Sequence, residues 1–309
     1  MCDDLARNGR RRLDTASRVP PCMDEDSPPA PDARRGPSKR SVDYLLEGES
    51  VRANAHLRAF VERHDRSLLW RLRFDDNYAS WARIKGKSLR KEITEAMAAS
   101  GFAREELEAM TAAGDGRREV VVYDLCSGKG LTAAVCAEAL PDVREVVMVD
   151  NDGRMMLKHL ESEPLVRFRR MDVYDEGVGV MMAASRESGA RIVLTGVHLC
   201  GELSRRAVEL FSRYGDVLIL SPCCLVRELR AGKRRNGTFG YGLPRLAKRL
   251  GGDSYDLWTK LLASIVPTHV GEGFRVRKRV VTDENMMTEK NRFIILRREG
   301  SSELCAPCR

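Results

Sequence analysis

The feature that most constrains the fold of this chain is a regular alternation of short apolar runs with helix-forming stretches. The apolar runs are typical of strands and lie near 120–124, 145–149, 167–171, 191–195 and 216–221. Helices are predicted between them, near 131–140, 153–160, 178–188 and 203–213. This order predicts right-handed βαβ crossovers and a parallel sheet.

Two further β-rich runs follow the alternation and define one edge of the sheet. "FRVRKRVVT" covers 274–282 and "NRFIILRRE" covers 291–299, with a short, turn-like linker between them. A short linker joins antiparallel neighbours, whereas parallel strands need a long crossover. We therefore expect an α/β fold: a Rossmann-like, mostly parallel seven-stranded sheet with an antiparallel edge hairpin.

The sequence before the first strand is of two kinds. Residues 1–40 are rich in Pro and charge and lack apolar periodicity, which predicts disorder. From 41 to 118, apolar residues recur at three- and four-residue steps and predict a helical N-terminal cap. We assign 119–300 to the α/β domain and 301–309 to a flexible tail.

Two aromatic residues of the cap, Tyr78 and Trp81, precede a run of cations that ends at Lys91. Aromatic rings interleaved with cations can stack on bases and pair with phosphates. The alternative is that both rings anchor the cap in the hydrophobic core. The sequence is compatible with either interpretation.

Composition excludes several classes of protein. The longest apolar runs are far shorter than the roughly 20 residues that span a bilayer, so we expect a soluble protein. The nine cysteines are scattered, unlike a secreted disulfide framework, which indicates a cytoplasmic or nuclear location. Targeting to an organelle is an alternative, although acidic residues such as Asp3 and Asp14 are unusual in a transit peptide.

Positive charge is concentrated in one segment. The chain carries a formal charge of +8, and residues 227–279 hold thirteen Lys/Arg against four Asp/Glu. A polyanion such as RNA is expected to bind there. The alternative is an ordinary solvated basic surface.

The stretch "VVYDLCSGKGLTAAV", from Val121 to Val135, combines a strand, a glycine-containing turn and a helix. Its glycines lack the spacing of a phosphate-binding P-loop. Gly128 to Ala133 does fit the dinucleotide pattern G-x-G-x-x-[G/A], so an NAD-dependent oxidoreductase is one alternative. The strand, however, ends on Asp124, which would repel a pyrophosphate and attract a cationic amino group.

Asp124 to Gly130 resembles motif I of class I methyltransferases, D/E-x-G-x-G-x-G, with Cys126 in place of the first glycine. The resemblance implies S-adenosyl-L-methionine as cofactor. It also implies that the cofactor contacts are Asp124, Cys126, Ser127, Gly128, Gly130, Asp150, Asp172 and His198. Asp150 ends the second strand, where an acid can accept hydrogen bonds from ribose hydroxyls. By the resemblance, Asp172 contacts the adenine amino group; the alternative is that both acids are strand-end caps.

The fourth strand ends in "TGVHLCGELS" and the fifth in "LSPCCLVRE". Neither contains the D/N-P-P-aromatic signature of amino-group methylases. Over about 119–226 the combination resembles the methyltransferase family that includes the tRNA acceptor-stem 2′-O-methyltransferase and several methyltransferase-like proteins. It departs from the tRNA enzymes at Leu225, where they carry histidines, and in having no zinc-finger modules before the domain. The resemblance implies an RNA substrate and tRNA processing.

Four residues are candidates for catalysis. His198 is the first candidate for the base that accepts the proton of an acceptor hydroxyl, and Glu202 is the second. Cys223 and Cys224 allow thiolate attack on a pyrimidine, or they form an inert structural pair. His198, Cys200 and the two cysteines lack a recognised zinc-ligand spacing, so no metal is predicted.

Two alternatives to an RNA methyltransferase remain. A methyltransferase with a protein or small-molecule acceptor would use the same cofactor site. A non-catalytic module that binds the cofactor or RNA would keep the fold without turnover.

Overall fold

The structure is a computed structural model that describes residues 42, 46, 48–82, 86–117, 119–224, 242–268 and 274–300. The chain separates into two units, Met1–Ser38 and Lys39–Arg309, and every described residue belongs to the second. The predicted disorder at 1–40 and the predicted tail at 301–309 lie outside the described residues. The domain boundaries therefore stay predictions.

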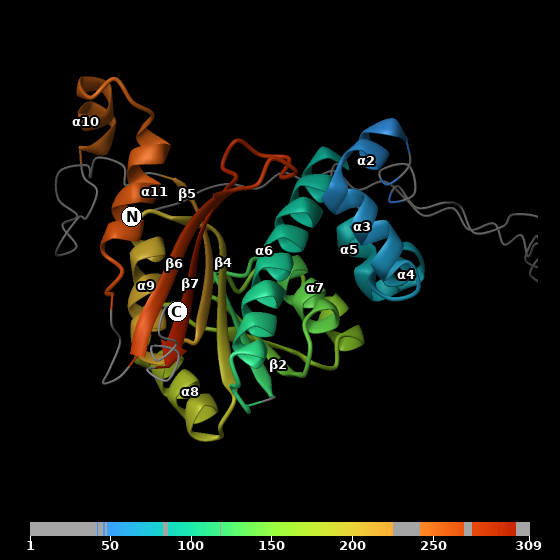
Figure 1. The fold of residues 1–309 in the computed structure, drawn as a ribbon. Helices are drawn as coiled ribbons and strands as arrows, with labels where there is room; N and C mark the ends of the chain where they lie inside the picture. Colours follow the sequence, from blue (N-terminus) through green and yellow to red (C-terminus); the bar gives the residue numbers. More distant parts are fainter. Residues whose placement is uncertain are drawn as a thin grey trace, which may run out of the picture. The chain divides into compact units, whose positions relative to one another are not determined.

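Seven strands form one sheet in the order β3-β2-β1-β4-β5-β7-β6 (Figure 1). The first five run parallel to their neighbours: β1 (Val120–Leu125), β2 (Val143–Asp150), β3 (Val166–Arg170), β4 (Arg191–Cys200) and β5 (Val217–Cys224). β7 (Arg292–Gly300) is antiparallel to both β5 and β6 (Phe274–Thr282). The predicted fold, including its antiparallel edge hairpin, is confirmed.

Three of the predicted helices are present: α7 (Leu131–Ala139), α8 (Glu176–Glu187) and α9 (Glu202–Tyr214). The helix predicted at 153–160 is wrong, because that region holds only the 3-10 turn η2 (Lys158–Ser162). Asp150 accepts a hydrogen bond from the Asp152 N–H, and Asp152 accepts one from the Arg154 N–H. These local bonds offer the backbone an alternative to a helix. Helices α10 (Leu243–Arg249) and α11 (Ser254–Ser264) were not predicted.

The N-terminal region is helical, as predicted from its periodicity. It consists of α2 (Glu49–Ala53), α3 (Ala55–His64), α4 (Leu68–Phe74), η1 (Asp76–Tyr78), α5 (Ala79–Ala82) and α6 (Gly86–Ala112). Tyr78 and Trp81 are each 1% exposed and pack in a core with Leu57 and Phe60. Their interpretation as core anchors is confirmed, and base stacking by Trp81 is wrong because its ring is buried. The neighbouring cations Arg83 and Lys85 lie outside the described residues.

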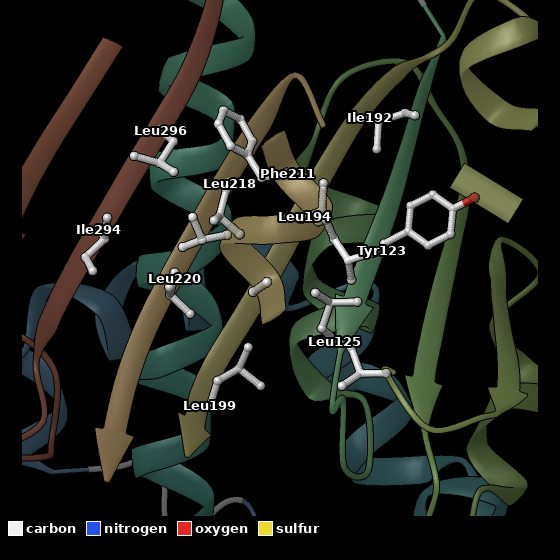
Figure 2. Packing of buried hydrophobic residues seen from close by; sticks show 14 of the residues in the cluster. Tyr123, Leu125, Ile192, Leu194, Leu199, Phe211, Leu218, Leu220, Ile294 and Leu296 are labelled. Atoms are coloured by element: carbon white, nitrogen blue, oxygen red, sulfur yellow. The ribbon is translucent and has the colours of Figure 1, made fainter. Parts of the chain in front are cut away.

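Each face of the sheet has its own hydrophobic core, because successive strand residues point to opposite faces. Val121, Tyr123 and Leu125 of β1 pack with residues of α8, α9 and α11. Figure 2 shows Tyr123 and Leu125 in this cluster, together with Phe211 of α9. Val120 and Val122 pack toward α6 and α7 on the other face. The amino-terminal half of α6 also belongs to the core of the helical cap. Helix α6 therefore holds the cap against the sheet.

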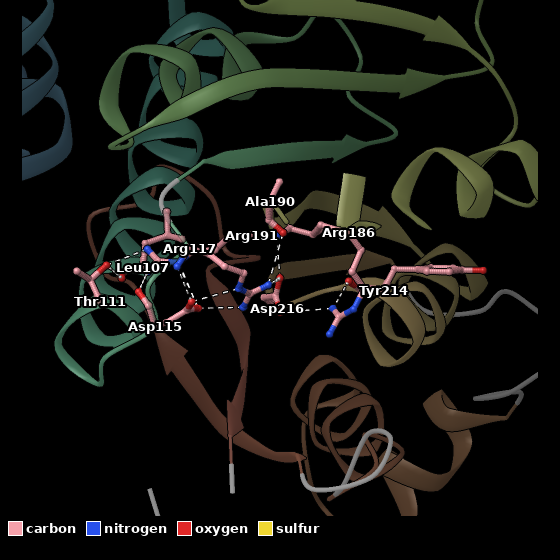
Figure 3. Close-up of polar contacts among 10 residues, drawn as sticks. Leu107, Thr111, Asp115, Arg117, Arg186, Ala190, Arg191, Tyr214 and Asp216 are labelled. Atoms are coloured by element: carbon pink, nitrogen blue, oxygen red, sulfur yellow. Dashed lines mark hydrogen bonds and ion pairs between the residues drawn. The ribbon is translucent and has the colours of Figure 1, made fainter. Parts of the chain in front are cut away.

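A polar network fixes the end of the sheet where β4 and β5 begin (Figure 3). Asp216, which is almost fully buried, accepts hydrogen bonds from Arg117 and from the Ile192 N–H. Arg186 donates to the Tyr214 carbonyl in the same network. We interpret this network as structural, which leaves the opposite edge, where the parallel strands end, for a ligand.

Candidate functional site

The turn after β1 has an unusual backbone. Cys126, Gly128 and Gly130 all have positive φ, at 54°, 54° and 80°. Glycine adopts this conformation without strain, whereas Cys126 does not. A Cβ on Gly130 would also lie 2.4 Å from Cε of Met148. The backbone conformation therefore favours glycine at 130, and a Cβ there would also require the flexible end of Met148 to move.

Asp124 lies at the end of β1 and is 1% exposed. Its Oδ1 accepts a 2.8 Å hydrogen bond from Thr195 Oγ1 of β4. Burial raises the pKa of Asp124 to about 7, and the negative charge of Asp150 adds to the rise. The Thr195 hydroxyl and the Ala133 backbone amide act in the opposite direction, because they stabilise the ionised form. Among the described residues, Asp124 Oδ2 and the buried Ser127 Oγ have no hydrogen-bond partner. Such groups are costly to bury unless a ligand satisfies them.

A cavity of about 370 Å³ lies beside this turn. Cys126, Asp150 and Asp172 line it, together with apolar residues that include Met171 and Leu203. The two oxygens of Asp150 accept hydrogen bonds from the N–H groups of Asp152 and Gly128, at 2.9 and 3.0 Å. Each carboxylate oxygen keeps a second lone pair that can accept a ligand hydroxyl. The structure thus brings Cys126, Asp150 and Asp172 to one cavity, while Asp124 points toward β4.

His198 lies near the end of β4, in the stretch that the sequence assigned to the end of the fourth strand, but with a backbone conformation that the local sequence does not reveal. Its φ is 59°, and the register between β4 and β5 shifts on both sides of Leu199. Strained backbone of this kind is common at functional sites. The His198 Nε2 atom is hydrogen-bonded to Glu95 Oε1 and lies 3.0 Å from Lys91 Nζ. Helix α6 therefore supplies two charged partners to the candidate base.

Lys91 and Glu95 were not among the site residues predicted from the sequence. Lys91 and Glu95 are four residues apart, and their side chains form a 2.6 Å ion pair. That spacing places both on one face of a helix. Burial raises the pKa of Glu92, and the charge of Glu95 adds to the rise. Nothing in the sequence places this face over the end of β4, because only the packing of α6 does so.

Three cysteine thiols gather where β4 and β5 end. Cys223 Sγ lies 3.0 Å from Cys200 Sγ and 3.4 Å from Cys224 Sγ. The Cys223 thiol also donates to the His198 carbonyl at 3.0 Å. Burial raises the pKa of Cys223, and hydrogen bonds with the other two thiols add to the rise. Both effects disfavour the thiolate of Cys223, which is the nucleophilic form of a cysteine.

Glu202, the second candidate base, is the first residue of α9. Its side chain lies 3.5 Å from Arg205, and its carbonyl accepts a hydrogen bond from the Tyr174 hydroxyl. Tyr174 lines the cavity, so Glu202 lies beside that cavity.

The basic segment is only partly described, since its cations from Arg227 to Arg235 lie outside the described residues. Arg279 pairs with Glu105 and Glu106, and Lys260 pairs with Asp256. The exposed cations on α10 and β6 include Lys248, Arg249, Arg275 and Arg277. Part of the segment's charge is thus neutralised within the protein. In the described parts of the chain, no helix has both the length and the apolar content to cross a membrane.

The sequence matches no protein-family model and no curated protein. Solved structures with a similar fold include the 23S rRNA methyltransferase ErmE, at 12% identity over 63% of this chain and 68% of that chain, with a TM-score of 0.31. A fibrillarin pre-rRNA processing protein from Methanococcus jannaschii matches at 11% identity, over 60% of this chain and 68% of its own, with a TM-score of 0.35.

A precorrin-6y C5,15-methyltransferase from Geobacter metallireducens matches at 14% identity, over 63% of this chain and 87% of its own, with a TM-score of 0.30. The names of the first two concern ribosomal RNA, and the name of the third concerns a precorrin. With TM-scores this low, none of the likenesses identifies the activity of this chain.

Proposed function

We propose that this chain is an S-adenosyl-L-methionine-dependent methyltransferase that acts on RNA. The observation that carries the proposal is the cradle after β1, in which Asp124 Oδ2 and Ser127 Oγ are buried without partners beside glycines at positive φ. An ammonium group would pair with Asp124, whereas the pyrophosphate of a dinucleotide would meet a carboxylate.

Each part of the cofactor has candidate partners in this site. Asp124 would hold the amino-acid end, and the backbone of Cys126, Ser127, Gly128 and Gly130 would lie against it. Asp150 would accept the ribose hydroxyls, and Asp172 would accept the adenine amino group. His198 would close the site on the acceptor side. When bound, the cofactor supplies a methyl group on a sulfonium, which is already activated for displacement.

The main task of the protein is then to align the acceptor with the methyl group, and alignment can contribute about 7–11 kcal/mol. An acceptor hydroxyl also loses a proton, and we assign its acceptance to His198. Glu95 would hold the imidazole in place and stabilise its positive charge. Glu202 is the alternative base.

Attack by Cys223 or Cys224 is the alternative route. It requires a thiolate, and burial opposes thiolate formation at Cys223.

The RNA substrate is supported by two observations. The exposed cations of α10 and β6 can pair with phosphates. In addition, "HLCG" and "PCC" resemble the family that contains the tRNA acceptor-stem 2′-O-methyltransferase. The finer proposal is therefore transfer to a ribose 2′-hydroxyl of tRNA. Such a hydroxyl requires a base, which His198 would provide.

Calorimetry tests the cofactor. We expect S-adenosylhomocysteine to bind and NAD not to bind. Asp150→Ala should weaken binding at least about tenfold, since a lost charge-assisted hydrogen bond costs about 1.5–3 kcal/mol. Asp152→Ala is the matched control, because Asp152 is a neighbouring acid that pairs with exposed Arg154. Binding of NAD, or equal loss in both variants, would contradict the assignment.

Transfer of a labelled methyl group into fractionated RNA and protein tests the acceptor. Label should enter RNA, and His198→Ala should reduce it by about 100-fold or more. His56→Ala is the control, since His56 pairs with Asp283 outside the site. Loss in Cys224→Ala alone would favour the cysteine route, and label only in protein would exclude RNA. No transfer despite cofactor binding would favour a non-catalytic module.

A further inference from the structure

The ends of β4 and β5 depart from regular strand geometry in a way that gathers three thiols. Cys200 is the last residue of β4, and its Cα pairs with that of Cys224, the last residue of β5. Consecutive side chains of a regular strand point to opposite faces. The Sγ atoms of Cys223 and Cys224 nevertheless lie 3.4 Å apart.

The register shift around Leu199 brings Cys200 to the same place, 3.0 Å from Cys223. All three Sγ atoms lie within 4.8 Å of one another. This convergence is a property of both strand ends and their pairing. The positions of the three cysteines in the sequence therefore do not predict that their thiols meet.

These distances suit a common metal ion. A Zn–S bond of about 2.3 Å places two tetrahedral sulfur ligands about 3.8 Å apart. Cys223 Sγ lies 3.0 and 3.4 Å from the other two sulfur atoms, slightly closer than that value, so small side-chain rotations would suffice. Cys200 and Cys224 are exposed and Cys223 is half-buried, which gives an ion access from solvent.

We propose that Cys200, Cys223 and Cys224 form a binding site for a soft metal ion of the Zn²⁺ class. Thiolates are the ligands that such ions prefer. The described residues supply three ligands, and His198 Nε2 is not a fourth, because Glu95 and Lys91 occupy it. Three protein ligands with one open position are typical of zinc sites that bind water or substrate.

The three thiols lie next to the backbone of His198. The His198 carbonyl accepts hydrogen bonds from the Cys223 thiol, at 3.0 Å, and from the Cys200 thiol, at 3.7 Å. A bound ion would therefore lie beside the strained segment that holds the candidate base. This inference concerns metal binding alone and does not depend on methyl transfer.

The test uses the full chain, purified with a phosphine reductant and without chelators. We expect elemental analysis to find one zinc ion per chain after incubation with Zn²⁺ and desalting. Replacement by Co²⁺ should produce thiolate-to-cobalt charge-transfer bands and intense visible bands of a tetrahedral site. Both readouts are independent of enzymatic activity.

Cys224→Ser is the first variant, because Cys224 is exposed and its replacement should disturb folding least. Loss of a residue that only contacts a metal ligand weakens metal binding by about 10–100-fold. Loss of a ligand itself should cost more, so Cys224→Ser should weaken Zn²⁺ binding by more than this. Cys223→Ser should do the same. Cys136→Ala is the matched control: Cys136 is a buried free cysteine of α7 and should leave the cobalt spectrum unchanged.

Two results would overturn the proposal. The first is an unchanged zinc content or cobalt spectrum in the Cys223→Ser and Cys224→Ser variants, which would place the ion elsewhere. The second is an intact mass that is two hydrogens lower before reduction, with a Cys200–Cys223 crosslink in the peptide map and no bound metal. That outcome would identify a disulfide, formed by loss of two electrons and two protons to an oxidant such as peroxide.

Discussion

Thr195 of β4 donates a hydrogen bond to Oδ1 of Asp124 on β1, and the other carboxylate oxygen of Asp124 stays buried without a partner among the described residues. This pair joins the two central strands at the edge where the candidate site lies. Burial removes the Asp124 carboxyl group from water and makes its ionisation costly in the folded protein, and the Thr195 hydrogen bond offsets only part of this cost.

Stability should therefore depend on pH through Asp124. Its pKa is about 7 in the folded protein, above the ordinary value of 3.8, so between these values the folded state binds more protons than the unfolded state. The free energy of unfolding should then fall as pH rises from about 4 to about 7. Asp124→Asn should flatten this decline, as measured by urea unfolding across that range. A parallel decline in both proteins would contradict the prediction.

Cys126→Gly should stabilise the protein by about 1 kcal/mol, because it relieves a side chain from the left-handed region. Urea unfolding of the reduced protein measures the change. Cys136→Gly is the contrasting control, since Cys136 lies inside α7 and its replacement should destabilise. Lower stability in both variants would show that Cys126 contributes more by packing than it costs by strain.

Gly130→Ala should cost about 1–3 kcal/mol, because alanine would be strained at φ 80° and its Cβ would approach Met148. Gly189→Ala isolates the first cause: Gly189 has φ 84°, with no atom within 4 Å of an added Cβ. The difference between the two variants measures the contact with Met148. Equal losses in thermal unfolding would mean that Met148 moves freely.

Glu95→Gln should lower methyl transfer by about tenfold or more, while cofactor affinity stays constant, because the imidazole of His198 would lose its charged partner. Glu108→Gln, on an exposed position of the same helix, is the control and should have no effect. Initial rates at saturating cofactor, combined with calorimetry, separate the two properties. A normal rate in Glu95→Gln would exclude this role.

Trp81→Ala should destabilise the protein by about 3–5 kcal/mol, as expected for a large ring in a packed core. Trp70 is 51% exposed, and Trp70→Ala should change stability by less than about 0.5 kcal/mol. Chemical denaturation measures the change in stability of both variants. A stable Trp81→Ala protein with weakened RNA binding would restore the base-stacking interpretation.

The sequence by itself determined the layered α/β fold. Strand and helix periodicities are local, and the short linker before β7 determines antiparallel pairing with β6. The turn residues Gly128 and Gly130 were also readable, because glycine at positive φ is a local requirement. Where side chains competed for the backbone, as Asp150 and Asp152 do, helical periodicity gave the wrong prediction.

Only the tertiary structure decided which side chains meet. The packing of α6 brings Glu95 and Lys91 to His198, and the register shift of β4 on β5 brings Cys200 to Cys223. Burial, in turn, raises the pKa of Asp124 and removes Trp81 from solvent. These are contacts between residues distant in the chain. No local pattern encodes them, because they depend on how whole elements pack.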